Sequence, residues 1–121
     1  MSVLDNVNRL NELLAQGKTM EALDELYHKD VVVVEGDGEV RNGVDAQKKA
    51  MEGWFEMIKE THSEGVGAVT VNEDTGRACI ESWVDLTRKD GVRMKMEEVA
   101  VQKWENGKIV HERFYYDVPK Q

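Results

Sequence analysis

The residues of this chain that could do chemistry are carboxylates that alternate with aromatic side chains in its C-terminal half. In the segment "KIVHERFYYD", Glu112, Phe114 and Tyr116 share one face if the segment is extended, because alternate residues of a strand point to the same side. A carboxyl group between aromatic walls suits acid/base chemistry or the orientation of a small hydrophobic molecule. The other face carries His111 and Tyr115, so both faces of this strand are expected to make contacts.

Other kinds of chemistry have little support in the sequence. The chain has three scattered histidines and neither an HExxH motif nor a Cys/His cluster, so no metal site is predicted. Cys79 is the only cysteine, which excludes an internal disulfide, and it is more typical of a small buried residue than of a nucleophile. The glycines of "GDGEVRNG" have the spacing of turns and not of a phosphate-binding loop. We therefore expect no metal and no cofactor.

Composition and charge narrow the class of protein further. A length of 121 residues, with 40% hydrophobic and 33% charged residues, is typical of a single folded domain over residues 1–121. The formal net charge of -8 argues against nucleic acid or an anionic membrane as a partner, because both attract positive charge. The N-terminus lacks the apolar core of a signal peptide, and no apolar run is long enough to span a membrane. These features predict a cytoplasmic protein.

Three helices are expected in the first half of the chain. The first follows a capping box formed by Ser2 and Asp5, and the second starts at Thr19. The period of apolar residues predicts a third helix from Val44 to His62. Between the second and third helices, the β-branched run "VVVVE" (31–35) is typical of a buried strand.

Strands account for the second half. The segments "EGVGAVTVN", "GRACIESWVDLT", "VRMKMEEVAVQKW" and "KIVHERFYYD" are separated by "EDTG", "RKDG" and "ENG", which have the composition of hairpin turns. Three consecutive hairpins predict an antiparallel sheet of four strands, with the early strand added at an edge. Helices followed by such a meander predict an α+β fold with the helices on one face of the sheet.

The order of these elements, together with "ALDELYHKDVVVVEGDGEVRNGVDA" and "WENGKIVHERFYYD", resembles the SnoaL-like proteins of the nuclear transport factor 2-like superfamily. The resemblance covers residues 3 to 117. It implies a cystatin-like or nuclear transport factor 2-like fold: a cone-shaped α+β barrel with three N-terminal helices packed in a curved, mostly antiparallel sheet. The concave face of such a sheet lines a pocket, and the convex face often forms a homodimer. Members of the family include isomerases, epoxide hydrolases, dehydratases, polyketide cyclases and proteins without catalytic activity.

Matching the chain to the family pattern assigns the faces of three strands. The side chains expected to point inward are Glu81, Trp83, Asp85, Thr87, Met96, Glu98, Ala100, Gln102, Glu112, Phe114 and Tyr116. Those expected to point outward are Ile80, Val84, Val99, Val101, Ile109, His111 and Tyr115. The outward set is too apolar for a solvated face, which favours a homodimer through the convex side of the sheet. The inward carboxylates indicate either an acidic, solvent-filled pocket or exposed strand ends with a few satisfied pairs.

The resemblance also suggests catalytic residues. Glu35 falls where the isomerases carry a general-base carboxylate, His62 resembles the histidine of dehydratase-like members, and Asp85 matches one of the two acids of epoxide hydrolases. These three residues are predicted to form an acid/base group. The alternatives are a strand-end acid in solvent for Glu35 and a cation at a helix C-terminus for His62. The residues predicted to bind substrate are Trp54, Trp83, Glu98, Gln102, Glu112, Phe114 and Tyr116.

No known active site of the family is complete in this sequence. The oxyanion-hole tyrosine of the isomerases falls near Leu10 or Asn11, and their protonated aspartate falls near Ala100. The second acid of the epoxide hydrolases falls on Phe114 and their arginine on Trp83. Two classes of function therefore remain. One is a cofactor-free enzyme that isomerises, cyclises or dehydrates a small hydrophobic molecule, and the other is a non-catalytic ligand-binding or dimerisation module of the same fold.

Overall fold

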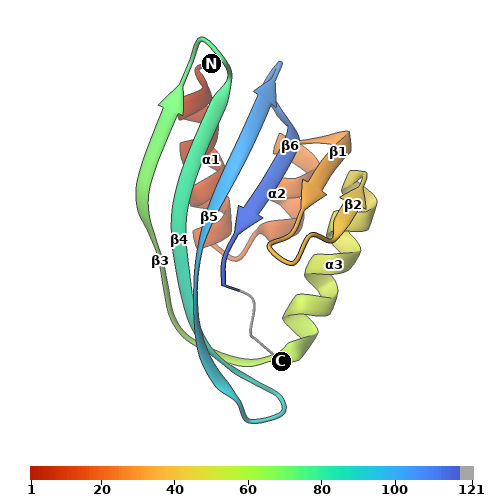
Figure 1. The fold of residues 1–121 in the computed structure, drawn as a ribbon, viewed down its shortest axis with the longest axis vertical. Coiled ribbons are helices and arrows are strands. Elements are labelled where there is room, and N and C mark those ends of the chain that lie inside the picture. Colours follow the sequence, from red (N-terminus) through yellow and green to blue (C-terminus); the bar gives the residue numbers. More distant parts are fainter. Residues whose placement is uncertain (118–121) are drawn as a thin grey trace.

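The computed structural model describes residues 1–117, which form three helices and a six-stranded sheet (Figure 1). The strands lie in the order β2-β1-β6-β5-β4-β3, and all neighbouring pairs are antiparallel except β1 and β6. The predicted α+β fold class is therefore confirmed. The elements in chain order are α1 (Val3–Ala15), α2 (Thr19–Leu26), β1 (Tyr27–Val34), β2 (Val40–Asn42), α3 (Val44–Met57), β3 (Ile58–Asn72), β4 (Arg77–Arg88), β5 (Arg93–Glu105) and β6 (Lys108–Tyr115).

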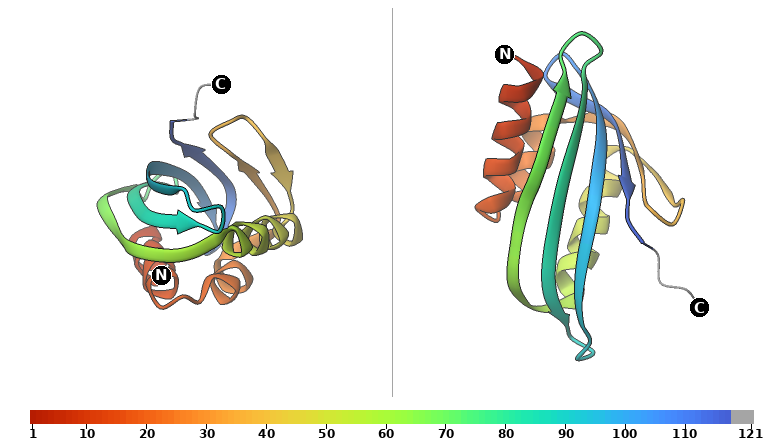
Figure 2. Two further views of the ribbon diagram at one scale, coloured as in Figure 1. Left: turned by 90° about the horizontal axis from the view of Figure 1, so that it is seen from below. Right: turned by 60° about the vertical axis from the view of Figure 1, so that its left-hand side comes forward.

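The sheet is strongly curved and all three helices lie on its concave side (Figure 2). Helix α1 packs against β3 and β4, whereas α3 lies beside β1 and β2 at the other edge of the sheet. Strands β3, β4 and β5 continue well beyond the ends of α1 and α2 (Figure 1). No helix within residues 1–117 is both long and apolar enough to cross a membrane.

The core forms where α1 and α2 meet the sheet. The predicted capping box is confirmed, since the Ser2 hydroxyl accepts from the Asp5 backbone N–H at 3.0 Å and the Asp5 carboxylate accepts from the Ser2 backbone N–H at 3.3 Å. This start of α1 turns its apolar stripe toward the sheet, where burial of side chains such as Val7 stabilises the fold. The main buried residues are Val7, Leu10, Leu13, Leu26, Val31, Val33, Trp104 and Ile109.

The turn between β5 and β6 sets the register of the central strands. Asn106 and Gly107 both have positive φ, 51° and 75°, as expected for the predicted two-residue hairpin turn. From this turn the ladder runs through the pairs Gln102–Glu112 and Ala100–Phe114. Directly paired residues share a face, so these four side chains point into the concave side together.

Two predicted elements are wrong in their bounds. Helix α3 ends at Met57 and not at His62, and β3 starts immediately afterwards at Ile58. The reason is that Ile58 and the residues after it pair with β4 along its whole length, which outweighs the helical period of the sequence. Residues Val40–Asn42, predicted as part of a turn, form the short strand β2 in a tight hairpin with β1.

The face predicted for β4 is also wrong. The unshifted register pairs Ile80 with Ala100 and Val84 with Met96, so Ile80 and Val84 point inward and not outward. The reason is burial: this register places Ala78, Ile80 and Leu86 of β4 in the interior, and a one-residue slip exchanges the faces of a strand. The other face of β4, which is convex, carries the residues predicted to point inward: Glu81, Trp83, Asp85 and Thr87.

Ile109 is a further correction, because it is fully buried in the core and does not lie on the convex face. A shift of register between Lys103 and Trp104 pairs Ile109 with Trp104 and changes the alternation at the start of β6. The remaining outward predictions hold. Val99, Val101, His111 and Tyr115 lie on the face opposite the one shared by Gln102 and Glu112.

Candidate functional site

A cavity of about 1010 Å³ lies between the concave face of the sheet and the helices. Its volume is at the upper end of the range of small-molecule sites. Apolar side chains form most of its wall, and its polar part includes Glu35 and Arg41 of the β1–β2 hairpin, Glu98 of β5 and Glu112 of β6. Three carboxyl groups of this polar part, Glu35, Glu98 and Glu112, differ in their partners and so in what they can do.

Glu35 is held by a cation and a hydroxyl group. It continues the inward face of β1 after Val33, and the hairpin places Arg41 opposite Val33 in β2. The Glu35 carboxylate forms an ion pair with Arg41 and accepts a hydrogen bond from the Tyr116 hydroxyl at 2.9 Å. Arg41 is oriented in turn by its Nε–H, which donates to the buried Gln47 side chain at 2.8 Å.

Tyr116 fits beside Glu35 because the next residue in the hairpin is a glycine. A Cβ atom at position 36 would lie 2.9 Å from the Tyr116 ring, so any other residue at Gly36 would push this ring away. Burial, followed by the hydrogen bond to Glu35 and its negative charge, raises the pKa of the Tyr116 hydroxyl to about 12. Tyr116 therefore keeps its proton at neutral pH and acts as a donor to Glu35.

Glu112 lies in a closed network of uncharged partners. Its side chain is only 2% exposed and accepts from the Tyr27 hydroxyl at 2.5 Å and from the Gln102 amide at 2.7 Å. Gln102 in turn accepts from the Trp104 indole N–H at 2.9 Å. Burial raises the pKa of Glu112 to about 7, although the hydrogen bonds from Tyr27 and Gln102 act in the opposite direction. Burial and the nearby Glu112 hold the pKa of Tyr27 well above its usual range.

Glu98 is the carboxyl group that faces open space. It lies on β5 between Met96 and Ala100, opposite Ser82 of β4, and lines the cavity. Burial, and then the negative charges of Glu112 and Glu35, raise its pKa to about 7. Within residues 1–117 no hydrogen-bond donor of the protein contacts its carboxyl group, in contrast to those of Glu35 and Glu112. A ligand in the cavity can therefore exchange a proton with Glu98 without breaking an internal bond.

Most of the predicted site residues meet at this cavity. Trp83 also borders it, although its side chain starts from the convex face, where it lies over Gly65 and next to Lys95. Glu64 and Val66 of β3, which pair with Val84 and Ser82 of β4, also line the cavity. The predicted residues that line the cavity with Trp83 are Glu35, Trp54, Glu98, Gln102, Glu112, Phe114 and Tyr116.

The predicted group of Glu35, His62 and Asp85 is not assembled. Asp85 lies on the convex face, where the Arg93 guanidinium donates to it twice at 3.1 Å and holds the pKa of the Asp85 carboxyl below its usual range. The His62 ring is 2.7 Å from the Thr87 hydroxyl. Neither His62 nor Asp85 lines the cavity, because β4 presents its other face and α3 ends before His62.

Sequence reasoning missed Arg41, Tyr27 and Gln47, which hold the cavity carboxylates in place or orient their partners. A signal for Arg41 was present: if "VVVVEGDGEVRN" is taken as one tight hairpin, alternation puts Arg41 on the same face as Glu35. Tyr27 and Gln47 had no comparable signal, because their roles depend on contacts between distant elements. No group of three or more His, Cys, Asp or Glu within residues 1–117 is placed to hold a metal ion.

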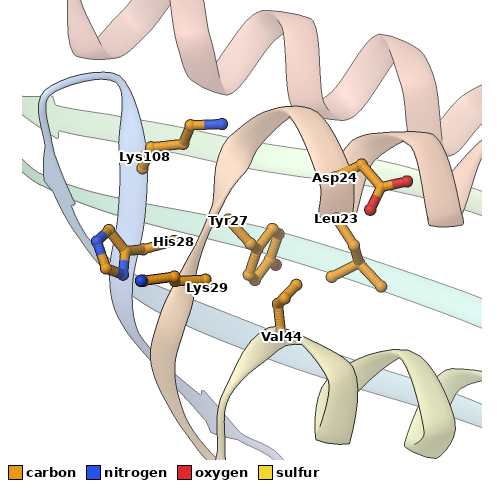
Figure 3. A pocket seen from close by; sticks show the side chains of 7 residues that line it. All are labelled: Leu23, Asp24, Tyr27, His28, Lys29, Val44 and Lys108. Carbon is orange, nitrogen blue, oxygen red and sulfur yellow. The ribbon is translucent and has the colours of Figure 1, made fainter.

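A second, smaller pocket of about 330 Å³ lies among the end of α2 and the starts of β1, α3 and β6 (Figure 3). Tyr27 and Leu23 line both spaces, and the Tyr27 hydroxyl points to Glu112 in the larger one. None of the cavity carboxylates lines the smaller pocket, so the larger cavity is the candidate site. The smaller pocket is lined by Leu23, Asp24, Tyr27, His28, Lys29, Val44 and Lys108.

The chain is similar to known proteins over nearly its whole length. A model of the SnoaL-like domain matches residues 1–116, and the chain belongs to this family. A protein of Mesorhizobium loti, provisionally named a SnoaL-like polyketide cyclase and carrying the words carbohydrate phosphatase in its name, is 30% identical, with a TM-score of 0.85 over 96% of this chain and 100% of that one.

More distant structures share the fold. A nuclear transport factor 2-like protein of unknown function from Burkholderia pseudomallei is 19% identical, with a TM-score of 0.81 over 97% of this chain and 92% of that one. A protein of Bacillus subtilis provisionally named an isomerase is 15% identical, with a TM-score of 0.77 over 95% and 86%. Among curated proteins, none matches the chain. The predicted family is confirmed, and the names of the similar proteins refer to different activities.

Proposed function

We propose that the cavity binds a small, mostly hydrophobic molecule and that Glu98 transfers a proton on it without a cofactor. The observation that carries this proposal is the Glu98 carboxyl group, which faces a large apolar cavity and has no donor from the protein within residues 1–117. A pKa of about 7 suits both the removal and the return of a proton at neutral pH. The names of the relatives, polyketide cyclase and isomerase, describe reactions in which protons are moved on carbon.

The proposed reaction begins with a substrate C–H bond next to a carbonyl group. The Glu98 carboxylate takes this proton, and the electron pair of the C–H bond moves into the carbonyl to form an enolate. The Asn11 amide and the Ser82 hydroxyl also line the cavity and supply donors for the enolate oxygen. Glu98 then returns the proton to another carbon in an isomerisation, or to a departing hydroxyl group in a dehydration.

This proposal can be tested without the natural substrate. The probe is 2-tetralone in D2O, a bicyclic ketone whose acidic protons exchange for deuterium by the proposed first step, and exchange is followed by proton NMR. We expect the protein to accelerate exchange and Glu98→Gln to remove the acceleration. Glu97→Gln is the matched control, because Glu97 is adjacent in sequence but lies on the convex face. Binding of the ketone without faster exchange would support the non-catalytic binding module, and absence of binding would reject the site.

We also propose that the convex face of the sheet forms a homodimer. Its central residues Val99, Val101 and His111 are only partly exposed even in the single chain, and the neighbouring Tyr115 ring is half exposed. Val32 and Val34 of β1 extend this face beyond β6, because they pair with His111 and Arg113. These apolar side chains flank Arg113, which pairs with Val101 and Val34 on the same face. Apolar side chains gathered on a sheet face favour association, and a two-fold pairing of identical sheets is the simplest form.

A further inference from the structure

The cavity has a polar and an apolar part, which constrains the shape of a ligand. Glu35, Glu98 and Glu112 lie close enough for their charges to affect one another, so they form one polar region. Three other lining residues are large, apolar and well exposed: Leu14 (40%), Phe55 (46%) and Val66 (49%). They come from α1, α3 and β3, so the cavity reaches solvent along an apolar edge. A ligand that fits both parts has a polar head inside and an apolar body that extends toward the surface.

The charged residues that line the cavity indicate which charge the polar head of the ligand carries. Among the described residues that line the cavity, four are glutamates and one, Arg41, is a cation. Arg41 is already engaged, since it forms the ion pair with Glu35 and donates to Gln47. Glu112 is partly compensated by the engaged Arg41, which lowers its pKa, whereas within residues 1–117 no cation shifts the pKa of Glu98. An anionic ligand near Glu98 would therefore meet negative charge in a desolvated space.

The aromatic residues around the polar region are a separate reason to expect a positively charged head. Tyr27, Phe114, Tyr116 and Trp54 all line the cavity. The Tyr27 hydroxyl donates to Glu112 and the Tyr116 hydroxyl donates to Glu35. Phe114 pairs with Ala100, so it lies two residues along the strands from Glu112 and Glu98. The face of an aromatic ring carries negative partial charge and attracts ammonium groups. A wall of rings with carboxylates between them is therefore complementary to a cation with an apolar body, and less so to an alcohol or an acid.

We propose that the ligand of this cavity is an amphipathic amine, with its ammonium group at Glu98 and its apolar body against Phe114 and Trp54. This inference rests on the proposed function only in using the same cavity, and it names the class of molecule that the cavity takes. The ammonium group would also lower the pKa of Glu98, because a positive charge beside a carboxylate favours its ionised form.

The test compares three probes that share one apolar body: 2-(2-naphthyl)ethylamine, 2-(2-naphthyl)ethanol and 2-naphthylacetate. Calorimetric titration of the whole protein at neutral pH measures their affinities. We expect the amine to bind about tenfold or more tightly than the alcohol, and the carboxylate to bind least. In Glu98→Gln the amine should lose this advantage while the alcohol keeps its affinity. Glu97→Gln on the convex face should bind all three probes as the unmodified protein does.

The outcomes separate this inference from the proposed function. If the alcohol binds as tightly as the amine in the unmodified protein, the amine class is wrong and the cavity remains a site for neutral molecules. If the carboxylate binds best, the sign of the charge argument is wrong. If none of the three probes binds, both the inference and the proposed function fail. The comparison of amine and alcohol needs only the unmodified protein, so a poorly folded variant would not prevent the decision.

Discussion

Two carboxyl groups on opposite faces of the sheet, Asp85 and Glu112, are held in opposite ways. On the convex face, Asp85 accepts two hydrogen bonds from Arg93, and this cation holds the pKa of Asp85 below its usual range. On the concave face, Glu112 accepts from Tyr27 and Gln102, which are uncharged, and burial raises its pKa to about 7. The side chains are chemically alike, so the difference comes from their surroundings.

The comparison teaches which carboxyl groups of the sheet can do acid/base chemistry. A carboxylate beside an arginine stays ionised across the neutral range and has little tendency to accept a proton. A carboxyl group with a pKa of about 7, such as Glu98, is present in both forms near pH 7. The adjacent residues Glu97 and Glu98 belong to different faces and so provide a matched pair within a single strand.

The largest expected effect concerns the convex face as an interface. In the proposed homodimer, Val101→Glu would bury a carboxylate at the interface, where Arg113 directly across in β6 offsets part of the desolvation cost, and weaken association by about 4 kcal/mol. Sedimentation at micromolar concentration should show a dimer for the unmodified protein and a monomer for this variant. Val92→Glu is the matched control, because Val92 lies exposed at the turn between β4 and β5 and should leave the dimer intact. A monomeric unmodified protein would contradict the proposal.

A smaller effect is expected from pH. Below pH 4.5, Glu112 is neutral in the folded and the unfolded chain, whereas above pH 7 the folded state must ionise a buried carboxyl group. A raised folded pKa therefore means that the free energy of unfolding falls as pH rises through this window, by about 3 kcal/mol for one such group. Glu98 acts in the same direction. Urea unfolding at pH 5 and pH 8, at one protein concentration, should show the fall, and Glu112→Gln should reduce it.

The convex face provides the control for this pH dependence. Because the folded pKa of Asp85 is lowered, its pair with Arg93 stabilises the fold above the unfolded pKa and is lost only on acidification through the lowered value. Asp85→Asn should therefore leave the difference between pH 5 and pH 8 unchanged. Equal pH dependence in Glu112→Gln and the unmodified protein would show that the two faces do not differ in the way described.

Breaking the hydrogen-bond network that joins Glu112, Gln102 and Trp104 should cause a more moderate loss of stability. Gln102→Leu removes the amide that donates to Glu112 and the carbonyl that accepts from Trp104, and both partners are buried. Leaving buried polar groups without partners lowers the free energy of unfolding by about 2 kcal/mol. Val101→Leu, one residue away on the convex face, should change it by less than about 1 kcal/mol. A similar loss in both variants, measured by urea unfolding, would mean that packing and not the network is responsible.

The sequence predicted the fold well because the signals for it are local. Turn residues such as Asn106 and Gly107 fixed the hairpins, and helical periodicity located the helices. Apart from Ile109, the faces of β5 and β6 followed correctly from the family pattern, which is why Glu98, Glu112 and Phe114 were expected where they lie.

The errors in the candidate site come from features that alternation alone does not determine. Strand β4 has large apolar residues on both faces, Ile80 and Trp83 among them, so its pattern does not choose a register. The shift beside Trp104 reverses the face of Ile109. The ion pair between Arg41 and Glu35 crosses the β1–β2 turn, and it was missed because β2 was predicted as part of the turn and not as a strand.

The smallest expected effect compares two glycines that accommodate rings on opposite sides of the sheet. A Cβ at Gly36 would lie 2.9 Å from the Tyr116 ring at the cavity, and a Cβ at Gly65 would lie 2.9 Å from the Trp83 indole nitrogen on the convex side. Each alanine substitution should displace the ring and lower the free energy of unfolding by about 1 kcal/mol, the size of one lost hydrogen bond or packing contact.

The two alanine variants differ in which signals they move in NMR spectra. Gly36→Ala should shift the side-chain resonances of Glu35 and Tyr116, because the 2.9 Å hydrogen bond between them depends on the position of the ring. Gly65→Ala should shift the indole N–H of Trp83, which lies next to Lys95, and leave Glu35 unchanged. If Gly65→Ala also shifts the Glu35 signals, Trp83 acts on the polar part of the cavity from the convex side, and the two faces are not independent.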